Sequence, residues 1–282
     1  MKGLSRKKQG TACRVIPGFG LSMGISITML SLLVLIPLAS VLAYSLKLSF
    51  GEFWELIGKE EVRHAFSTSI LCSFLAAVCN GFFGLLLAWI LVRYEFPGKR
   101  LLDGLIELPF ALPTAVAGIT LSKMYADTGI PGKYLAKLGL HISYTKVGLT
   151  IALIFVGIPF VVRAIQPVLE KLDSSYEEAG TMLGAGKRKI FFRIILPELG
   201  PALLTGIGLA FARGIGEYGS VIYISGNSAK EHTQVVSYVI MQKLNYVDYA
   251  SATAIALVML IFSFFILLLI NLIQVHQSKR TG

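Results

Sequence analysis

An arginine and a glutamate near the end of one apolar stretch have the clearest chemical potential in this sequence. Arg213 and Glu217 stand four residues apart, a spacing at which two helical side chains can form an ion pair. Ionisable side chains at membrane depth usually serve an ion or substrate pathway. The pair is therefore interpreted either as a polar gate or pathway lining, or as a pair that reaches to the outer membrane interface.

Two prolines and two hydroxyls form the second set of candidate residues. Pro109 and Pro113 interrupt an apolar stretch, and each removes a backbone donor, so that carbonyls are freed for protein or for water in a pathway. Thr114 and Ser220 offer hydroxyls that could line such a pathway. Two simpler explanations stay open: the prolines form a packing kink, and the hydroxyls bond to their own helix backbone.

The sequence contains no residues with the spacing of a catalytic or metal site. The three cysteines and four histidines are scattered, and Cys72 and Cys79 lie roughly 10 Å apart on one helix, too far to bridge. Residues 214–219 fit G-x-G-x-x-G outside any strand-helix-strand unit, and Gly186-Lys187 lacks the following Ser or Thr of a phosphate-binding loop. We expect no enzyme activity, metal or cofactor in this chain.

Composition indicates that these residues are positioned by membrane-spanning helices. Of 282 residues, 55% are hydrophobic and 15% charged, whereas soluble domains have about 25% charged residues. A helix needs about 20 apolar residues to cross a bilayer. The windows that qualify are 15–46, 66–92, 103–123, 147–167, 194–212 and 249–278. We predict an all-α membrane protein with six transmembrane helices, the first over 19–46.

The positive charges predict the orientation of these helices. Connections on one side hold 16 Lys and Arg residues and those on the other side hold 10, and retained positive charge marks the cytoplasmic side. We expect cytoplasmic tails over 1–18 and 274–282. A cleaved signal peptide is the alternative for the first window, although its apolar run is too long for one. Because the positive charge flanks apolar spans, we expect lipid and no nucleic acid as its partner.

The polar segment 163–193 is the longest informative loop of the predicted cytoplasmic side. Asp173, Ser174 or Ser175 can cap a short helix with two acidic residues in its first turn. Glycines 184 and 186 then end this helix. We expect a second short helix from residue 187, and a turn into the fifth span at Pro197.

This loop resembles the EAA motif of the permeases of ATP-binding-cassette (ABC) importers, with Gly180 in place of the second alanine. The resemblance implies that the loop couples the permease to a separate cytoplasmic ATPase. The residues that carry this expected role are Glu178, Ala179, Gly180, Gly184, Ile194, Leu196 and Pro197. Gly180 in place of alanine weakens a helix by up to about 1 kcal/mol, which docking to a partner could offset.

Residues 108–118 and 216–227 resemble the T-type permeases of sulfate/thiosulfate importers, and the likeness runs from about residue 20 to 272. The resemblance implies a type I (MetI-like) fold with its permease domain over 66–273, in an inner or plastid membrane. It also implies a W-type permease partner, two ATPase subunits that bind ATP and Mg, and an external binding protein. Molybdate/tungstate permeases have similar patterns. The residues also leave open a secondary anion transporter or a membrane enzyme.

Overall fold

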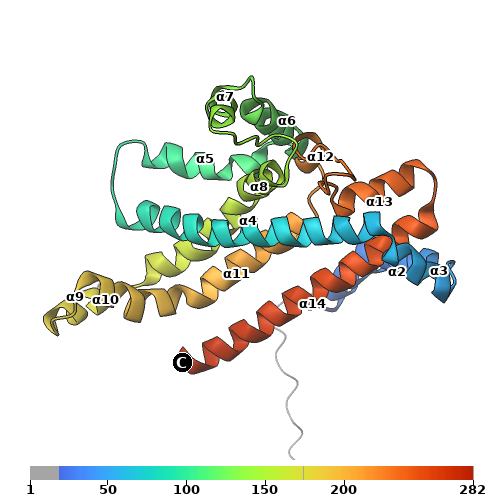
Figure 1. Cartoon of the computed structure of the whole chain (residues 1–282). Coiled ribbons are helices and arrows are strands. Elements are labelled where there is room, and N and C mark those ends of the chain that lie inside the picture. The colour runs from blue at the N-terminus through green and yellow to red at the C-terminus, as the bar shows by residue number, and fades with distance from the viewer. Residues whose placement is uncertain (1–18, 174, 282) are drawn as a thin grey trace, which may run out of the picture.

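The computed structural model describes residues 19–173 and 175–281, and within these ranges all regular elements are helical (Figure 1). The elements are α1 (Phe19–Leu30), a π-helical turn (Ser31–Leu35), α2 (Ile36–Ser45), α3 (Phe50–Gly58), α4 (Glu60–Arg93), α5 (Lys99–Ala111), α6 (Thr114–Tyr125), α7 (Ile130–Lys137), α8 (Lys146–Lys171), α9 (Ser175–Met182), α10 (Lys187–Ile190), a second π-helical turn (Phe191–Ile195), α11 (Leu196–Ile215), α12 (Val221–Ile224), α13 (Val236–Asn245) and α14 (Tyr249–Thr281).

Five helical stretches of the described residues are long and apolar enough to cross a membrane. They are Phe19–Ser45, Glu60–Arg93, Lys146–Lys171, Lys187–Ile215 and Tyr249–Gln274. Taken together, α5 and α6 are also long and apolar enough to cross a membrane, although the two helices are bent by 112° at their break. The predicted all-α fold with six spans is confirmed if this bent pair is counted as one span.

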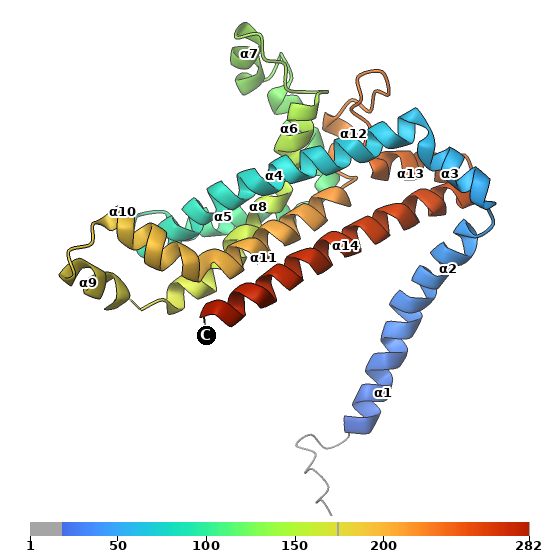
Figure 2. The ribbon, with the colours of Figure 1, turned by 60° about the horizontal axis from the view of Figure 1, so that its bottom comes forward.

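The centre of the molecule is the packing of α4, α8 and α11, which lie side by side in Figures 1 and 2. Their contacts are close because small residues face large ones. A Cβ added to Gly84 of α4 would lie 2.7 Å from Cγ1 of Val161, and one added to Gly206 of α11 would lie 2.7 Å from Cα of Val161. Small residues at such crossings let membrane helices approach closely, so this trio forms the rigid body on which the remaining elements depend.

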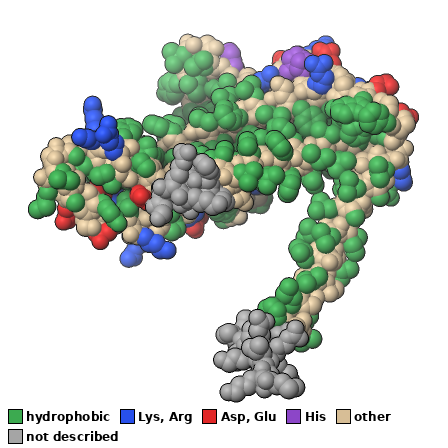
Figure 3. Space-filling model, turned by 90° about the horizontal axis from the view of Figure 1, so that it is seen from below, with side chains coloured by type: hydrophobic (Ala, Val, Ile, Leu, Met, Phe, Trp, Pro, Cys, Tyr) green, Lys and Arg blue, Asp and Glu red, His purple; other side chains and the backbone are tan. Residues whose placement is uncertain are grey.

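The first span lies apart from this body (Figure 2). None of its most apolar window is buried within the chain, and hydrophobic side chains make up much of its visible surface (Figure 3). Its end meets α14, where the rings of Tyr44 and Tyr249 lie 6.4 Å apart. A helix that is apolar all round is suited to lipid or to another membrane chain.

Several predicted boundaries are wrong. The third window is two helices, because Leu112 is extended and Pro113 precedes α6. The second span begins at Glu60, before residue 66, and α8 continues to Lys171, so the first residues of the polar segment predicted from 163 belong to α8. The expected tail from 274 continues α14, while the expected tail 1–18 lies outside the described residues.

The second short helix of the polar loop is also different from the prediction. Residues 187–215 form one continuous helical stretch through a π-helical turn, so Pro197 does not mark a turn into the fifth span. It occupies the first turn of α11. A proline is tolerated there because a π-helical turn has already shifted the backbone hydrogen bonds.

Candidate functional sites: the α9 turn and the broken span

Helix α9 is the separate short helix expected in the polar loop. Its first residue, Ser175, donates its backbone N–H to Oδ1 of Asp173 at 2.9 Å. Glu177 and Glu178 lie in its first turn, where negative charge is favoured by the helix dipole. The sequence therefore specifies where this helix begins.

The end of α9 is fixed by the predicted glycine. Gly184 has φ of +76°, a left-handed conformation that glycine adopts without steric cost. Its N–H donates to the carbonyl of Thr181 at 2.9 Å, and the N–H of Ala185 donates to the carbonyl of Gly180 at 3.0 Å. These two bonds form a Schellman motif, which makes the turn after α9 well defined.

Gly180 lets α9 pack against the start of the next helical stretch. The residue is buried, and a Cβ placed there would lie 3.1 Å from Cγ1 of Ile190 and 3.3 Å from Cδ1 of Ile194. The glycine thus has a packing partner within its own chain. This intrachain contact offsets part of the helix-weakening effect of the glycine. From the sequence alone, docking to a partner protein was the expected source of that compensation.

An ion pair that the sequence did not predict ties α9 to the end of α4. Arg93 Nη2 and Glu177 Oε1 lie 2.8 Å apart, with side chains 22% and 35% exposed. The pair is not aligned as a hydrogen bond, and the guanidinium also lies 5.7 Å from the centre of the Trp89 ring. Arg93 closes an apolar span, but no spacing rule links it to residue 177.

The rest of the α9 turn is open to solvent. Met182 and Leu183 are 91% and 88% exposed, and a large apolar side chain at such exposure often belongs to an interaction surface. The predicted coupling residues divide by position: Gly180 is buried, Ile194 and Leu196 are half-buried, and the exposed ones are Glu178, Ala179, Gly184 and Pro197. This end of the molecule therefore presents a short, rigid, partly apolar projection.

The break between α5 and α6 brings the predicted pathway residues to one place. Pro109 is buried inside α5, and Pro113 is the last residue before α6. The start of α6 packs on residues 219–220, since a Cβ on Gly219 would overlap Oγ1 of Thr114 and a Cβ on Gly118 would overlap the Ser220 carbonyl. The proline break and the segment after α11 are thus neighbours.

Glu217 is the most enclosed charged group of this region. Its side chain is 1% exposed and forms an ion pair with Arg213, which is 37% exposed. Its Oε1 accepts hydrogen bonds from the backbone N–H of Ser220 at 2.9 Å and from the Ser220 hydroxyl at 3.0 Å. The pair predicted from the four-residue spacing is present, and the Ser220 hydroxyl bonds to this carboxylate instead of to its own helix backbone.

No group of three or more His, Cys, Asp or Glu side chains suited to a metal ion occurs among the residues that the structure describes. Cys72 and Cys79 are both free thiols. The two candidate sites predicted from the sequence are thus the α9 turn and the region around Glu217.

Comparison with known proteins supplies the family. Residues 80–282 match the family described as binding-protein-dependent transport system inner membrane component. The sulfate transport system permease protein CysT of Escherichia coli (strain K12) is 46% identical over 95% of this chain and 96% of its own. The probable sulfate transport system permease protein cysT of Nephroselmis olivacea is 43% identical over 91% of each chain.

Solved structures share the fold at lower identity. A chain of a bacterial alginate ABC transporter, solved with its alginate-bound periplasmic protein, superposes with a TM-score of 0.76 at 17% identity, over 93% of this chain and 94% of that one. A chain of the MetNI methionine ABC transporter superposes with a TM-score of 0.57 at 16% identity, over 82% of this chain and 99% of that one. From the matched family model and the near full-length likeness to CysT, the chain belongs to the family of inner membrane permease components of binding-protein-dependent transport systems.

Proposed function

We propose that this chain is the T-type permease subunit of an ATP-driven sulfate importer and that α9 couples it to a separate ATPase. The observation that carries the proposal is the near full-length similarity to CysT permeases, together with an exposed, firmly held α9 at the position of the EAA motif. The chain itself acts in transport, and its partner ATPase binds ATP and Mg.

The form of the α9 turn suits a docking role. A helix that transmits force must keep its orientation, and the Schellman motif and the Arg93–Glu177 ion pair both restrict this one. Its apolar tip, Met182 and Leu183, has no covering element within the described chain. A cleft of the ATPase would bury these side chains, which favours association by removing apolar surface from water.

The orientation follows from this role. If α9 faces the cytoplasm, so does the end of α14, because Gln274 at that end donates a hydrogen bond to Thr205 in the half of α11 nearer α9. The first span ends beside the start of α14, so its own start would also face the cytoplasm. We propose that both termini are cytoplasmic and that a W-type permease, two ATPase subunits and an external binding protein complete the importer.

The region around Glu217 is our candidate for the anion pathway. Arg213 pairs with Glu217, whose carboxylate holds Ser220 beside the start of α6, and the Arg213 guanidinium is partly open to solvent. An oxyanion could replace the Glu217 carboxylate as the partner of the Arg213 guanidinium, since the paired N–H groups of arginine match the geometry of an oxyanion. The proposed pathway residues are Pro109, Pro113, Thr114, Arg213, Glu217 and Ser220.

The test is uptake by the whole assembly. The chain would be co-expressed with its permease partner and ATPase, purified, and placed in proteoliposomes with the external binding protein. We expect the ATPase to co-purify and labelled sulfate to enter only with ATP, and excess thiosulfate to compete more strongly than molybdate. Sulfate entry without ATP would identify a secondary transporter, and preferential competition by molybdate would assign the chain to molybdate import.

A further inference from the structure

A second arginine, Arg163 of α8, joins two helices through an ion cluster that the proposed function leaves unused. Its Nη1 donates to Oδ1 of Asp103 at 2.8 Å and also to Oε1 of Gln166, and its Nη2 donates to Oε1 of Glu107 at 2.6 Å. Asp103 and Glu107 lie one turn apart on α5. One guanidinium therefore holds two successive turns of the neighbouring helix.

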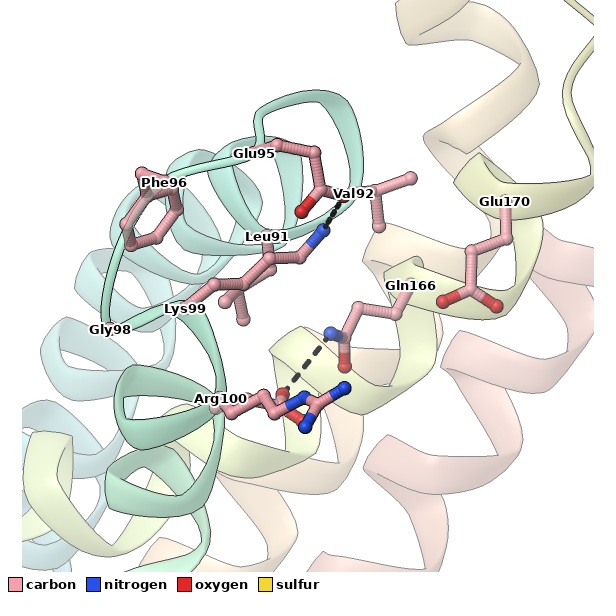
Figure 4. A pocket seen from close by; sticks show the side chains of 10 residues that line it. Leu91, Val92, Glu95, Phe96, Gly98, Lys99, Arg100, Gln166 and Glu170 are labelled. Atoms are coloured by element: carbon pink, nitrogen blue, oxygen red, sulfur yellow. Dashed lines mark hydrogen bonds and ion pairs between the residues drawn. The ribbon is translucent and has the colours of Figure 1, made fainter.

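This polar contact matters because the start of α5 is not closely packed against α8. A cavity of about 610 Å³ separates the beginning of α5 from the ends of α4 and α8, with Asp103 and Gln166 on its wall (Figure 4). One turn further along, Ile106 joins the apolar cluster that contains Val162 and Ile165. Near the break, the rings of Phe110 on α5 and Phe160 on α8 also lie 5.1 Å apart, so the ion cluster is the polar part of the contact between the two helices.

Arg163 also lies between the two candidate sites. It is eight residues from the end of α8, or about 12 Å by the helical rise, and α9 begins four residues after that end. Helix α5 leads in the other direction to the break before α6, which packs on Gly219 and Ser220 beside Glu217. If a movement of α9 displaces α8, α5 can transmit that displacement to the break only when α5 moves together with α8.

The chemistry of the cluster favours arginine specifically. A planar guanidinium presents several donors in a fixed fork and can bind two carboxylates at once, whereas a lysine ammonium acts as a single point charge. Its three partners leave this arginine committed to the contact, since both terminal nitrogens already donate. Charged groups within membrane-spanning helices are costly unless they are paired.

We propose that Arg163 is a positioning residue that makes α5 move with α8 and thereby links the α9 turn to the pathway break. The inference rests on the proposed coupling of this chain to an ATPase. The cluster stays intact through the transport cycle, and α5 and α8 shift as one unit. Loss of the cluster lets the ATPase complete its cycle while the pathway break no longer responds.

The experiment compares sulfate uptake with ATP hydrolysis in proteoliposomes that hold the full transporter. For Arg163→Ala we expect normal assembly, ATP hydrolysis within about two-fold of the wild type, and about 10-fold less sulfate imported per ATP. Arg163→Lys should recover only part of the ratio. Arg100→Ala is the matched control, because Arg100 lines the same cavity on α5 and has no ion pair among the described residues, and its ratio should stay unchanged.

An unchanged ratio in Arg163→Ala would overturn the proposal, as would a parallel loss of hydrolysis and uptake, which indicates a merely structural role. If Arg163→Ala does not assemble, Asp103→Asn is the deciding variant, since it keeps the side-chain shape and removes the charge. An unchanged ratio of sulfate imported per ATP in Asp103→Asn would contradict the proposal, and a lowered ratio would support it. A wild-type complex without ATP-driven uptake would instead refute the proposed function itself.

Discussion

The two arginine clusters of this permease are built in different ways. At the end of α11, Arg213 pairs with a single carboxylate, Glu217, which is 1% exposed and also holds Ser220. On α8, Arg163 pairs with two carboxylates, Asp103 and Glu107, which are 41% and 56% exposed. The first cluster is defined by a buried carboxylate, Glu217. The second is defined by one arginine, Arg163, that contacts two partly exposed carboxylates.

This difference predicts different consequences of mutation. A buried carboxylate has lost its water, so its partners must replace that solvation and their removal is costly. Partly exposed pairs are screened by water and individually contribute little to stability. The Glu217 cluster should therefore matter most for folding, whereas the Arg163 cluster should matter most for how two helices move together.

The largest effect on stability is expected at Glu217. Glu217→Ala removes the acceptor of the Ser220 N–H and the counter-ion of Arg213, and we expect a loss of about 2 kcal/mol, at the low end for a buried pair because Arg213 remains open to solvent. Glu217→Gln is the matched control, since its amide oxygen can still accept from Ser220, and should lose roughly half as much. Thermal unfolding in detergent measures both.

Two outcomes would contradict the role given to Glu217 burial. One is a Glu217→Ala protein that melts with the wild type. The other is a Glu217→Gln protein that is less stable than Glu217→Ala, because the retained acceptor would then have no value.

The smallest effect is expected at Glu107, the more exposed carboxylate of the second cluster. In Glu107→Gln, Arg163 keeps its contacts with Asp103 and Gln166. The free energy of unfolding should therefore change by less than about 0.5 kcal/mol, and the sulfate imported per ATP should be close to the wild-type value. Melting and uptake assays on the same preparation test this. A larger loss of stability than in Glu217→Gln would reverse the comparison.

The sequence predicted the features that depend on residues close together in the chain. Arg213 and Glu217 are four residues apart, and a glycine at position 184 indicates a helix end, so the ion pair and the α9 turn could both be expected. The apolar windows predicted the spans for the same reason, because a bilayer crossing is a property of about 20 consecutive residues.

The contacts that the sequence could not predict join distant segments. Arg163 meets carboxylates that precede it by 60 and 56 residues, and Arg93 meets Glu177 across 84 residues of chain. In the sequence, Arg163 lay inside the apolar window 147–167 and also opened the polar segment 163–193, and nothing nearby in the chain identified its partners. The structure pairs it with carboxylates on α5, within a helix that continues to Lys171.

The most direct test of the coupling role is whether the tip of α9 touches the ATPase. In a variant with the native cysteines replaced, Met182→Cys would be compared with Ile130→Cys of α7, which is 82% exposed and lies far from α9 in both ribbon views (Figures 1 and 2). A thiol cross-linker applied to the transporting complex should join Met182→Cys, and not Ile130→Cys, to the ATPase. A complex that imports sulfate and hydrolyses ATP while Met182→Cys stays unlinked would contradict the coupling role of α9.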